Sequence, residues 1–330
     1  MGFPGVKSAP VATRERAGDL AGMRIASLLA SATEIVFALG ADDQLVAISH
    51  ECDYPAEALT RPRVSRPRFD PSGLSSGAID AAVREAMAIH GSVYELDAEA
   101  LRAAHPDVLL AQEVCEVCAV PTSLARRAGD LLDPAPRVVS LDAHTVDGIL
   151  DTITQVGDVA GVPERAAELV AELRARIAEV ERRVAGRRRP RVLALEWLDP
   201  VFVPGHWGPE MIARAGGENL FGEAGRRSQQ VPWDALADAD PDVLLVLPCG
   251  SGLDAARAEA DARAERLHEI AGRAIASGRA WVLDGSSYFN RSGPRVVDGI
   301  EILGAILHPE AVHDVELVGR AEIWGGHRRA

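Results

Sequence analysis

The chain has 330 residues, of which 47% are hydrophobic and 25% are charged, and its formal net charge is −14. This length and composition predict an ordinary globular protein with two domains, each able to bury a core. The acidic balance excludes a general nucleic-acid-binding protein, because such proteins need a concentrated basic surface to displace counterions from phosphate. The one basic cluster, Arg187-Arg188-Arg189, falls between a predicted helix and a predicted strand, where we expect a solvated linker.

The first 22 residues mix Pro, Gly, Lys, Arg and Glu and are expected to form a disordered leader. They contain no apolar run long enough for the h-region of a secretory signal and no lipoprotein-like cysteine. No later segment has the ~20 apolar residues of a membrane helix, so no membrane insertion is expected. As written, the sequence therefore predicts a cytoplasmic protein. A periplasmic or extracellular location would require a misassigned start.

Short apolar strands alternate with helices through the first half and predict an α/β lobe over residues 23–145. Residues 56–80 interrupt the pattern with Pro, Arg, Ser and Gly, and a long loop is expected there. The expected elements are strands at 24–29, 45–49, 108–112 and 137–141 and helices at 34–39 and about 79–90.

The second half repeats this plan. The segment from Leu236 to Leu245 matches the segment from Leu101 to Leu110 without a gap, at a constant offset of 135 residues. Aligning Glu34 with Glu210 needs an offset of 176, so the first half carries 41 extra residues, which we place between 50 and 95. An internal repeat of this size predicts two copies of one α/β unit, and hence two lobes. The expected elements are strands at 191–196, 243–248 and 280–284 and a short helix from Pro209 to a glycine stop at 216–217, within a lobe at 190–310 followed by a tail at 311–330.

Residues 146–189 are predicted to form a helical bridge between the two lobes. The pattern has a weak point at Gly157 and a break at Gly161-Val162-Pro163, after which apolar residues recur at helical spacing. Glu and Arg at i, i+3 and i+4 suit a helix that faces water. A stiff bridge would limit opening and closing more than a flexible loop would.

Ligands of parallel α/β sheets gather at the carboxyl ends of the strands. The chain has only 5 Trp, 3 Tyr and 6 Phe, yet several of them follow predicted strands. These aromatic candidates are Tyr54, Trp197, Trp207, Tyr288 and Phe289. Flat rings bind by stacking and area burial, so the sequence predicts a large, flat, partly apolar ligand held between the lobes. His206 and Arg291 lie in the same loops and complete the predicted ligand-binding set.

A second candidate site combines His50, Cys52, Cys115 and Cys118 from neighbouring loops of the first lobe. Cys-x-x-Cys is a frequent zinc half-site, because that spacing lets both thiolates reach one ion, and zinc or iron is the expected metal. Two alternatives stay open: ordinary reduced loop cysteines and a thiol redox pair. The metal interpretation suggests a second function, a cytosolic metalloprotein or enzyme.

Motifs of the common catalytic and nucleotide-binding classes are absent from the sequence. Neither G-x-G-x-x-G after a strand nor G-K-[ST] occurs. The G-x-S-x-G pattern at Gly73–Gly77 falls in the expected loop over 56–80 and follows no predicted strand, so there is no nucleophile elbow. No catalytic residue is assigned, and ligand binding rather than catalysis is the expected activity.

Four segments together resemble the iron-complex/vitamin B12 substrate-binding proteins of ABC transporters, over about residues 24–308. They are Ser31-Ala-Thr-Glu-Ile-Val-Phe-Ala-Leu-Gly40, His50-Glu-Cys-Asp-Tyr-Pro55, Pro106-Asp-Val-Leu-Leu110 and Arg291-Ser-Gly-Pro-Arg295. Cys115-Glu-Val-Cys-Ala119, Glu196-Trp-Leu-Asp-Pro200 and Gly205-His-Trp207 are similar to a subgroup often labelled cobalamin-binding.

The resemblance implies a fold like that of class III periplasmic binding proteins, with two Rossmann-like lobes bridged by a long α-helix. It implies a cobalamin-like corrinoid, haem or iron chelate between the lobes, and a transporter permease as partner if the protein is exported. The aromatic candidates and Arg291 would contact the ligand, and His50, His144 or His206 would approach its metal. One departure is Asn290, where the B12 proteins have an acidic residue before the arginine.

Overall fold

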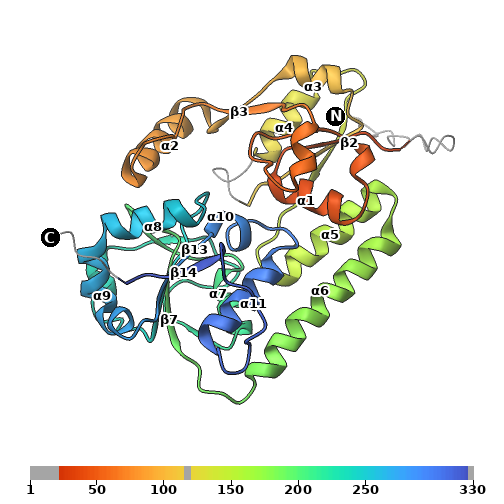
Figure 1. Ribbon diagram of the computed structural model, residues 1–330. Helices are drawn as coiled ribbons and strands as arrows, with labels where there is room; N and C mark the ends of the chain where they lie inside the picture. The colour runs from red at the N-terminus through yellow and green to blue at the C-terminus, as the bar shows by residue number, and fades with distance from the viewer. Residues whose placement is uncertain (1–21, 115–119, 326–330) are drawn as a thin grey trace, which may run out of the picture.

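Two mainly parallel β-sheets, one in each half of the chain, form the centres of two lobes (Figure 1). The structure is a computed structural model that describes residues 22–114 and 120–325. The N-terminal sheet has the order β2 (Leu45–Ile48), β1 (Ile25–Ser27), β5 (Val108–Ala111), β6 (Arg137–Ser140). The C-terminal sheet has the order β10 (Glu218–Asn219), β7 (Arg191–Leu195), β12 (Val243–Val246), β13 (Ala280–Leu283), β14 (Ala321–Ile323). The predicted α/β fold with two Rossmann-like lobes is confirmed.

Helices cover both faces of each sheet, which explains why the strands read as continuous apolar runs. Val108 and Leu110 of β5 pack in one core with the helices of the bridge, whereas Leu109 and Ala111 pack in a second core on the other face. The N-terminal helices are α1 (Ala30–Ala38), α2 (Ser76–His90), α3 (Ala98–Ala104) and α4 (Thr122–Gly129). The C-terminal helices are α7 (Gly208–Arg214), α8 (Leu253–Ala262), α9 (Ala264–Ala276), α10 (Gly285–Tyr288) and α11 (Val296–Leu307).

The repeat inferred from the sequence has a hydrogen-bonding basis. The backbone N–H of Arg24 donates to the Asp107 carboxylate at 3.0 Å, and that of Arg191 donates to the Asp242 carboxylate at 2.9 Å. In return, the N–H groups of Asp107 and Asp242 each donate to the arginine carbonyl at 2.8 Å. Each aspartate therefore fixes the start of the central strand of its lobe, which explains the Pro-Asp-Val-Leu-Leu sequence in both copies.

The extra residues of the first half lie between β2 and α3, as the offset predicted. They form an extension, here called the α2 arm, which consists of β3 (Ser65–Pro67), α2 and β4 (Tyr94–Leu96). The expected loop over 56–80 was wrong in part, because it contains a 3₁₀ turn at Ala56–Thr60, β3 and the start of α2. β3 is held by antiparallel pairing with β4, and the Ser75 hydroxyl caps α2 by accepting from the Ala78 N–H at 3.3 Å.

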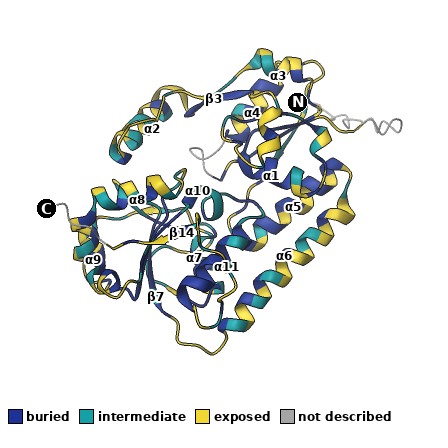
Figure 2. Cartoon of the chain, in the orientation of Figure 1, coloured by how far each residue is buried: buried dark blue, intermediate teal, exposed yellow. Residues whose placement is uncertain are grey.

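The predicted bridge consists of two helices, α5 (Val146–Ala160) and α6 (Pro163–Val184). Gly161 ends α5 with a φ of +70°, and Pro163 begins α6 in the position where proline is favoured. One core cluster runs from Ile25 and Val108 in the N-terminal sheet through both bridge helices to Val192 in the C-terminal sheet. The outer face of α6 is exposed and its inner face buried (Figure 2). The expected helical bridge is present, and it shares its core with both lobes.

Residues beyond 310, expected to form a tail, include β14, which extends the C-terminal sheet. β14 pairs antiparallel with β13, and Trp324 is 1% exposed, with its indole N–H donating to Asp261 at 2.7 Å. A three-residue strand has too short a pattern to be recognised, and its stability comes from pairing and burial in the finished lobe. The expected leader at 1–22 lies almost wholly outside the described residues. Across the described segments, 22–114 and 120–325, no helix combines the length and the apolar character needed to cross a membrane.

Candidate ligand-binding site between the lobes

A buried carboxylate from the N-terminal lobe receives two arginines from the C-terminal lobe. Glu34 lies in α1, and its side chain is only 3% exposed. It accepts from Arg291 Nη1 at 3.0 Å, and from Arg295 Nε at 3.0 Å and Nη2 at 2.7 Å. Buried carboxylates need this degree of pairing to remain ionised. The residues around 31–34 and 291–295, which carry much of the resemblance, are therefore the contact surfaces of the two lobes.

Asp53 from the loop after β2 completes the cluster. Its two carboxylate oxygens accept from Arg291 Nη1 at 2.6 Å and Nη2 at 3.2 Å. Burial would raise the pKa of Asp53, but the hydrogen bonds and charge of Arg291, together with the charge of Arg295, hold it below its usual value. Asp53 thus supplies from the opposite lobe the acidic partner of Arg291 that the sequence lacks at position 290. Asn290 instead donates to the Leu247 carbonyl at 2.9 Å, which stabilises its own loop.

Small residues allow the lobes to approach closely beside this cluster. The hydroxyls of Ser31 and Ser292 lie 3.3 Å apart, and Gln112 Nε2 donates to the Ser292 hydroxyl at 3.2 Å. A Cβ on Gly293 would lie 3.3 Å from Glu34 Oε2, so a larger residue would press against the buried ion pairs. The loop from 291 to 295 therefore supplies two positive charges and a hydroxyl, and its glycine lets the two lobes come close together.

Two tyrosines from different lobes flank the guanidinium of Arg295. The guanidinium carbon lies 4.2 Å from the ring centroid of Tyr54 and 5.6 Å from that of Tyr288. Arg320 stands 5.4 Å from the Tyr288 ring as well. Tyr54 is 49% exposed, so part of its ring is available to a ligand. Tyr54, Tyr288 and Arg291, all in the predicted ligand set, are thus brought together, with Arg295 as an addition that the sequence reasoning missed.

The other predicted aromatic residues lie deeper or apart. Trp207 and Phe289 are buried in the main core, and the Trp207 indole N–H donates to the Phe289 carbonyl at 2.6 Å. Trp197 is partly buried, and its indole donates to the Asp199 carbonyl at 3.0 Å. Trp207 and Phe289 support the loop that carries Tyr288. Their predicted contact with a ligand stays a prediction.

His206 faces His144 across the junction of the lobes. Their ring centroids are 5.6 Å apart and the rings are nearly stacked. His206 Nδ1 is buried and has no hydrogen-bond partner among the described residues. Burial, followed by the charges of His144 and Arg227, lowers the pKa of His206 and so favours the neutral ring. A neutral imidazole can coordinate a metal, as predicted for His206.

Glu196 and Cys249 were not among the predicted site residues. Burial raises the pKa of Glu196 to about 7, although a hydrogen bond with Ser228 opposes it. Burial also raises the pKa of the Cys249 thiol to about 12, assisted by the charges of Glu196 and Glu51. Glu51 comes from the N-terminal lobe, so this second acidic group also spans the junction. Their positions after β7 and β12, at the carboxyl ends of two neighbouring strands, were the signal that the sequence offered.

The predicted metal site is only partly within the described residues. Cys52 is buried, its Sγ lies 3.0 Å from the Thr33 hydroxyl, and burial raises its pKa to about 11. His50 Nδ1 is 2.7 Å from the Ser65 hydroxyl, and Nε2 is 3.1 Å from Glu51 Oε1 but out of line for a hydrogen bond. Cys115 and Cys118 lie outside the described residues, and the described part of the chain contains no group of three or more metal-ligating side chains. Zinc or iron binding by the four residues remains a prediction.

Two α/β lobes, a helical bridge and a charged, aromatic junction define a two-lobed binding protein. The profile of the periplasmic binding protein family matches residues 25–278, and the chain belongs to that family.

One curated relative and two solved structures are similar to this chain. The vitamin B12-binding protein of Vibrio cholerae is 24% identical over 280 residues, which cover 84% of this chain and 86% of the relative. A crystal structure of a periplasmic haem-binding protein from Pseudomonas aeruginosa has 24% identity and a TM-score of 0.66, covering 88% of this chain and 94% of the other. A periplasmic vitamin B12-binding protein of Vibrio cholerae has 23% identity and a TM-score of 0.63, covering 87% and 96%. The structural likenesses bear on the fold.

Proposed function

We propose that this protein binds a cobalamin-like corrinoid, or a related tetrapyrrole, between its lobes as a substrate-binding protein. The observation that carries the proposal is the stack of Tyr54, Arg295 and Tyr288, which joins rings from both lobes around a planar cation. Faces that accept a planar guanidinium also suit a flat, partly apolar macrocycle. Arg291 and Arg295 would complement carboxylate or phosphate groups at its edge. The relatives named for vitamin B12 and haem support this ligand class.

Titration of the protein with cyanocobalamin and, separately, with haemin tests the proposal. We expect a visible-spectrum change or a calorimetric signal for at least one of them at ~100 μM, a concentration that detects weak complexes. Tyr54→Ala should weaken binding by roughly 10-fold, because stacked area is lost, while Tyr54→Phe keeps the ring and should bind like the wild type. No signal with either compound, or equal affinity of Tyr54→Ala and wild type, would contradict the proposal.

We also propose that the protein works outside the cytoplasmic membrane and delivers its ligand to an ABC transporter permease. The support is its family and the periplasmic relatives, and this replaces the cytoplasmic location expected from the sequence. Fractionation of the source cells with a cytoplasmic marker enzyme tests it. Co-fractionation of the protein with that marker would reject the proposed location.

A further inference from the structure

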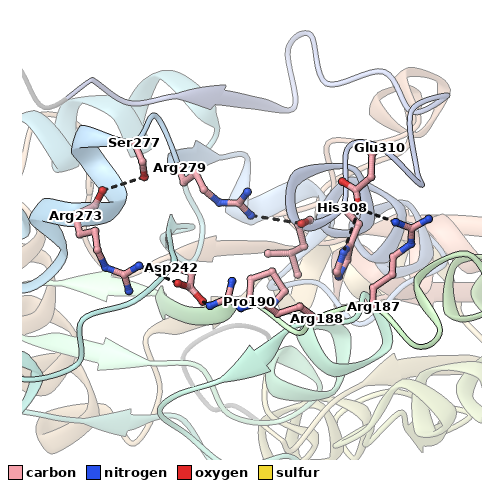
Figure 3. Close-up of a pocket in the computed structure, with 10 residues that line it drawn as sticks. Arg187, Arg188, Pro190, Asp242, Arg273, Ser277, Arg279, His308 and Glu310 are labelled. Atoms are coloured by element: carbon pink, nitrogen blue, oxygen red, sulfur yellow. Dashed lines mark hydrogen bonds and ion pairs between the residues drawn. The ribbon is translucent and has the colours of Figure 1, made fainter.

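A cavity of about 440 Å³ lies in the C-terminal lobe, lined by the residues drawn in Figure 3. Pro190, Asp242 and Arg279 line it, and they directly precede β7, β12 and β13. It therefore opens at the amino ends of these strands, whereas the ligand-binding candidates follow their carboxyl ends. Nothing in the proposed function uses it.

Four arginines and two carboxylates line this cavity, in a protein whose overall charge is −14. Arg188 and Arg273 pair with Asp242 at 2.8 and 3.0 Å, and Arg187 pairs with Glu310 at 2.9 Å. His308 Nδ1 is 3.9 Å from Glu310, and its Nε2 is 3.2 Å from the Gly216 carbonyl. Arg273 also pairs with Asp240 at 2.8 Å, just outside the lining. Four guanidiniums against these three carboxylates leave the cavity with an excess of positive charge.

Arg279 is the lining arginine for which no ion pair is observed within the described residues. Its Nη2 donates to the Leu307 carbonyl at a long 3.4 Å, and its Nε is buried without a hydrogen-bond partner. A buried donor without a partner costs free energy that a bound acceptor would recover. The guanidinium fork matches the paired oxygens of a phosphate group, so an anion seated here would satisfy it.

We propose that this cavity binds the phosphate group of a small molecule. Arg279 is the anchoring side chain. Arg188 and Arg273, which pair with Asp242, would also donate hydrogen bonds to the anion. The cluster Arg187-Arg188-Arg189, expected to be a solvated linker, thus contributes two of its three arginines to a binding cavity. The ligand is inorganic phosphate or pyrophosphate, or a phosphorylated organic molecule such as a nucleotide.

Calorimetric titration of the full-length protein with phosphate, pyrophosphate and ADP at ~50 mM salt tests this proposal, since low salt preserves exposed ionic contacts. We expect saturable binding of at least one of the three. Tighter binding of ADP than of pyrophosphate would identify the ligand as a phosphorylated organic molecule. Tighter binding of pyrophosphate would identify it as inorganic. Arg279→Gln should weaken binding by roughly 10-fold, the usual effect of losing a charge-assisted pair. The affinity of Arg279→Lys should fall between those of the wild type and Arg279→Gln.

Arg266→Gln is the matched control, since Arg266 lies on α9 outside the cavity and pairs with Glu269 at 2.9 Å. It should bind like the wild type. If Arg279→Gln fails to fold by circular dichroism, Arg188→Gln replaces it, because that side chain is exposed at the rim. No saturable binding of any of the three probes, or equal loss in the control and the cavity variants, would overturn the proposal. Because these probes do not address the inter-lobe junction, either outcome is independent of corrinoid binding.

Discussion

Glu196 is a carboxyl group whose environment favours the protonated form. Unfolded, it titrates at the ordinary value of 4.5, and in the folded protein burial raises its pKa to about 7. The folded state therefore holds this proton more tightly than the unfolded state does. Its contribution to stability is fully present below the unfolded pKa and is lost as pH rises through the folded pKa.

We predict that Glu196→Gln removes a pH dependence from the unfolding free energy. Between about pH 4.5 and 7 the wild type should lose on the order of 2 kcal/mol relative to the variant, which cannot ionise at this position. Urea denaturation of both proteins at several pH values in this interval measures the difference. Parallel profiles for wild type and variant would show that the site does not shift this pKa.

The aromatic members of the site were found because position after a strand is visible in a sequence, but the direction of a side chain is not. Tyr54 and Tyr288 reach the junction, whereas Trp207 and Phe289 turn into the core behind it. The pairing of Glu34 with Arg291 joins positions 257 residues apart. Only the folded chain shows that Glu34 is the buried acceptor for two arginines.

The α2 arm reaches from the N-terminal lobe to the C-terminal lobe (Figure 1). Ser76 donates from the start of α2 to Glu259 of α8 at 2.8 Å, and Arg84 donates to Gln230 at 3.3 Å. A Cβ on Gly77 would lie 2.8 Å from Asp199 Oδ2, so the first turn of α2 lies directly against the C-terminal lobe. Ala86, Val83 and Met87 pack α2 against the second core of the N-terminal lobe, while its contacts with the C-terminal lobe are polar.

We predict that removing these contacts loosens the arm without loosening the bridge. In the double variant Ser76→Ala/Arg84→Ala, amide hydrogen exchange in α2 should become faster by roughly 30-fold, because about 1 kcal/mol is lost with each of the two hydrogen bonds. Exchange in α5 and α6 should not change, since those helices share the main core. Mass spectrometry of peptic fragments measures both. Unchanged exchange in α2 would mean that the arm is held by other contacts.

Strands that consist entirely of apolar residues were predictable from the sequence, and shorter strands of mixed composition were not. β5 and β12 are buried on both faces and appear in the sequence as clear apolar runs. β3 consists of Ser, Arg and Pro, and β14 of Ala, Glu and Ile. Their conformation depends on partners elsewhere in the lobe, which local propensity does not register.

At the scale of the whole molecule, the junction restrains the lobes from one side and the bridge from another. The ion pairs of Glu34 tie α1 to the loop before α11, and α11 itself packs against α6. Hinge motion would have to break buried ion pairs and also shear a continuous apolar core.

We predict that ligand binding changes the overall dimensions very little. The radius of gyration, roughly 20 Å for a compact chain of this length, should change by less than about 1 Å when saturating cyanocobalamin is added, because the bridge resists bending. Small-angle X-ray scattering with and without the ligand measures this. A larger decrease would show that the free protein opens widely in solution and that the bridge acts as a hinge.

The core that passes through α5 and α6 shows how the two copies of the repeat differ from independent domains. Each half kept its own sheet and the aspartate that fixes its central strand. The apolar side chains on the inner faces of both sheets nevertheless belong to one cluster. The two halves therefore repeat the same hydrogen bonds at the start of their central strands, but they do not bury their apolar side chains independently. Each half keeps a separate core on the other face of its sheet, but the interior on the bridge side is complete only when both halves and the bridge are assembled.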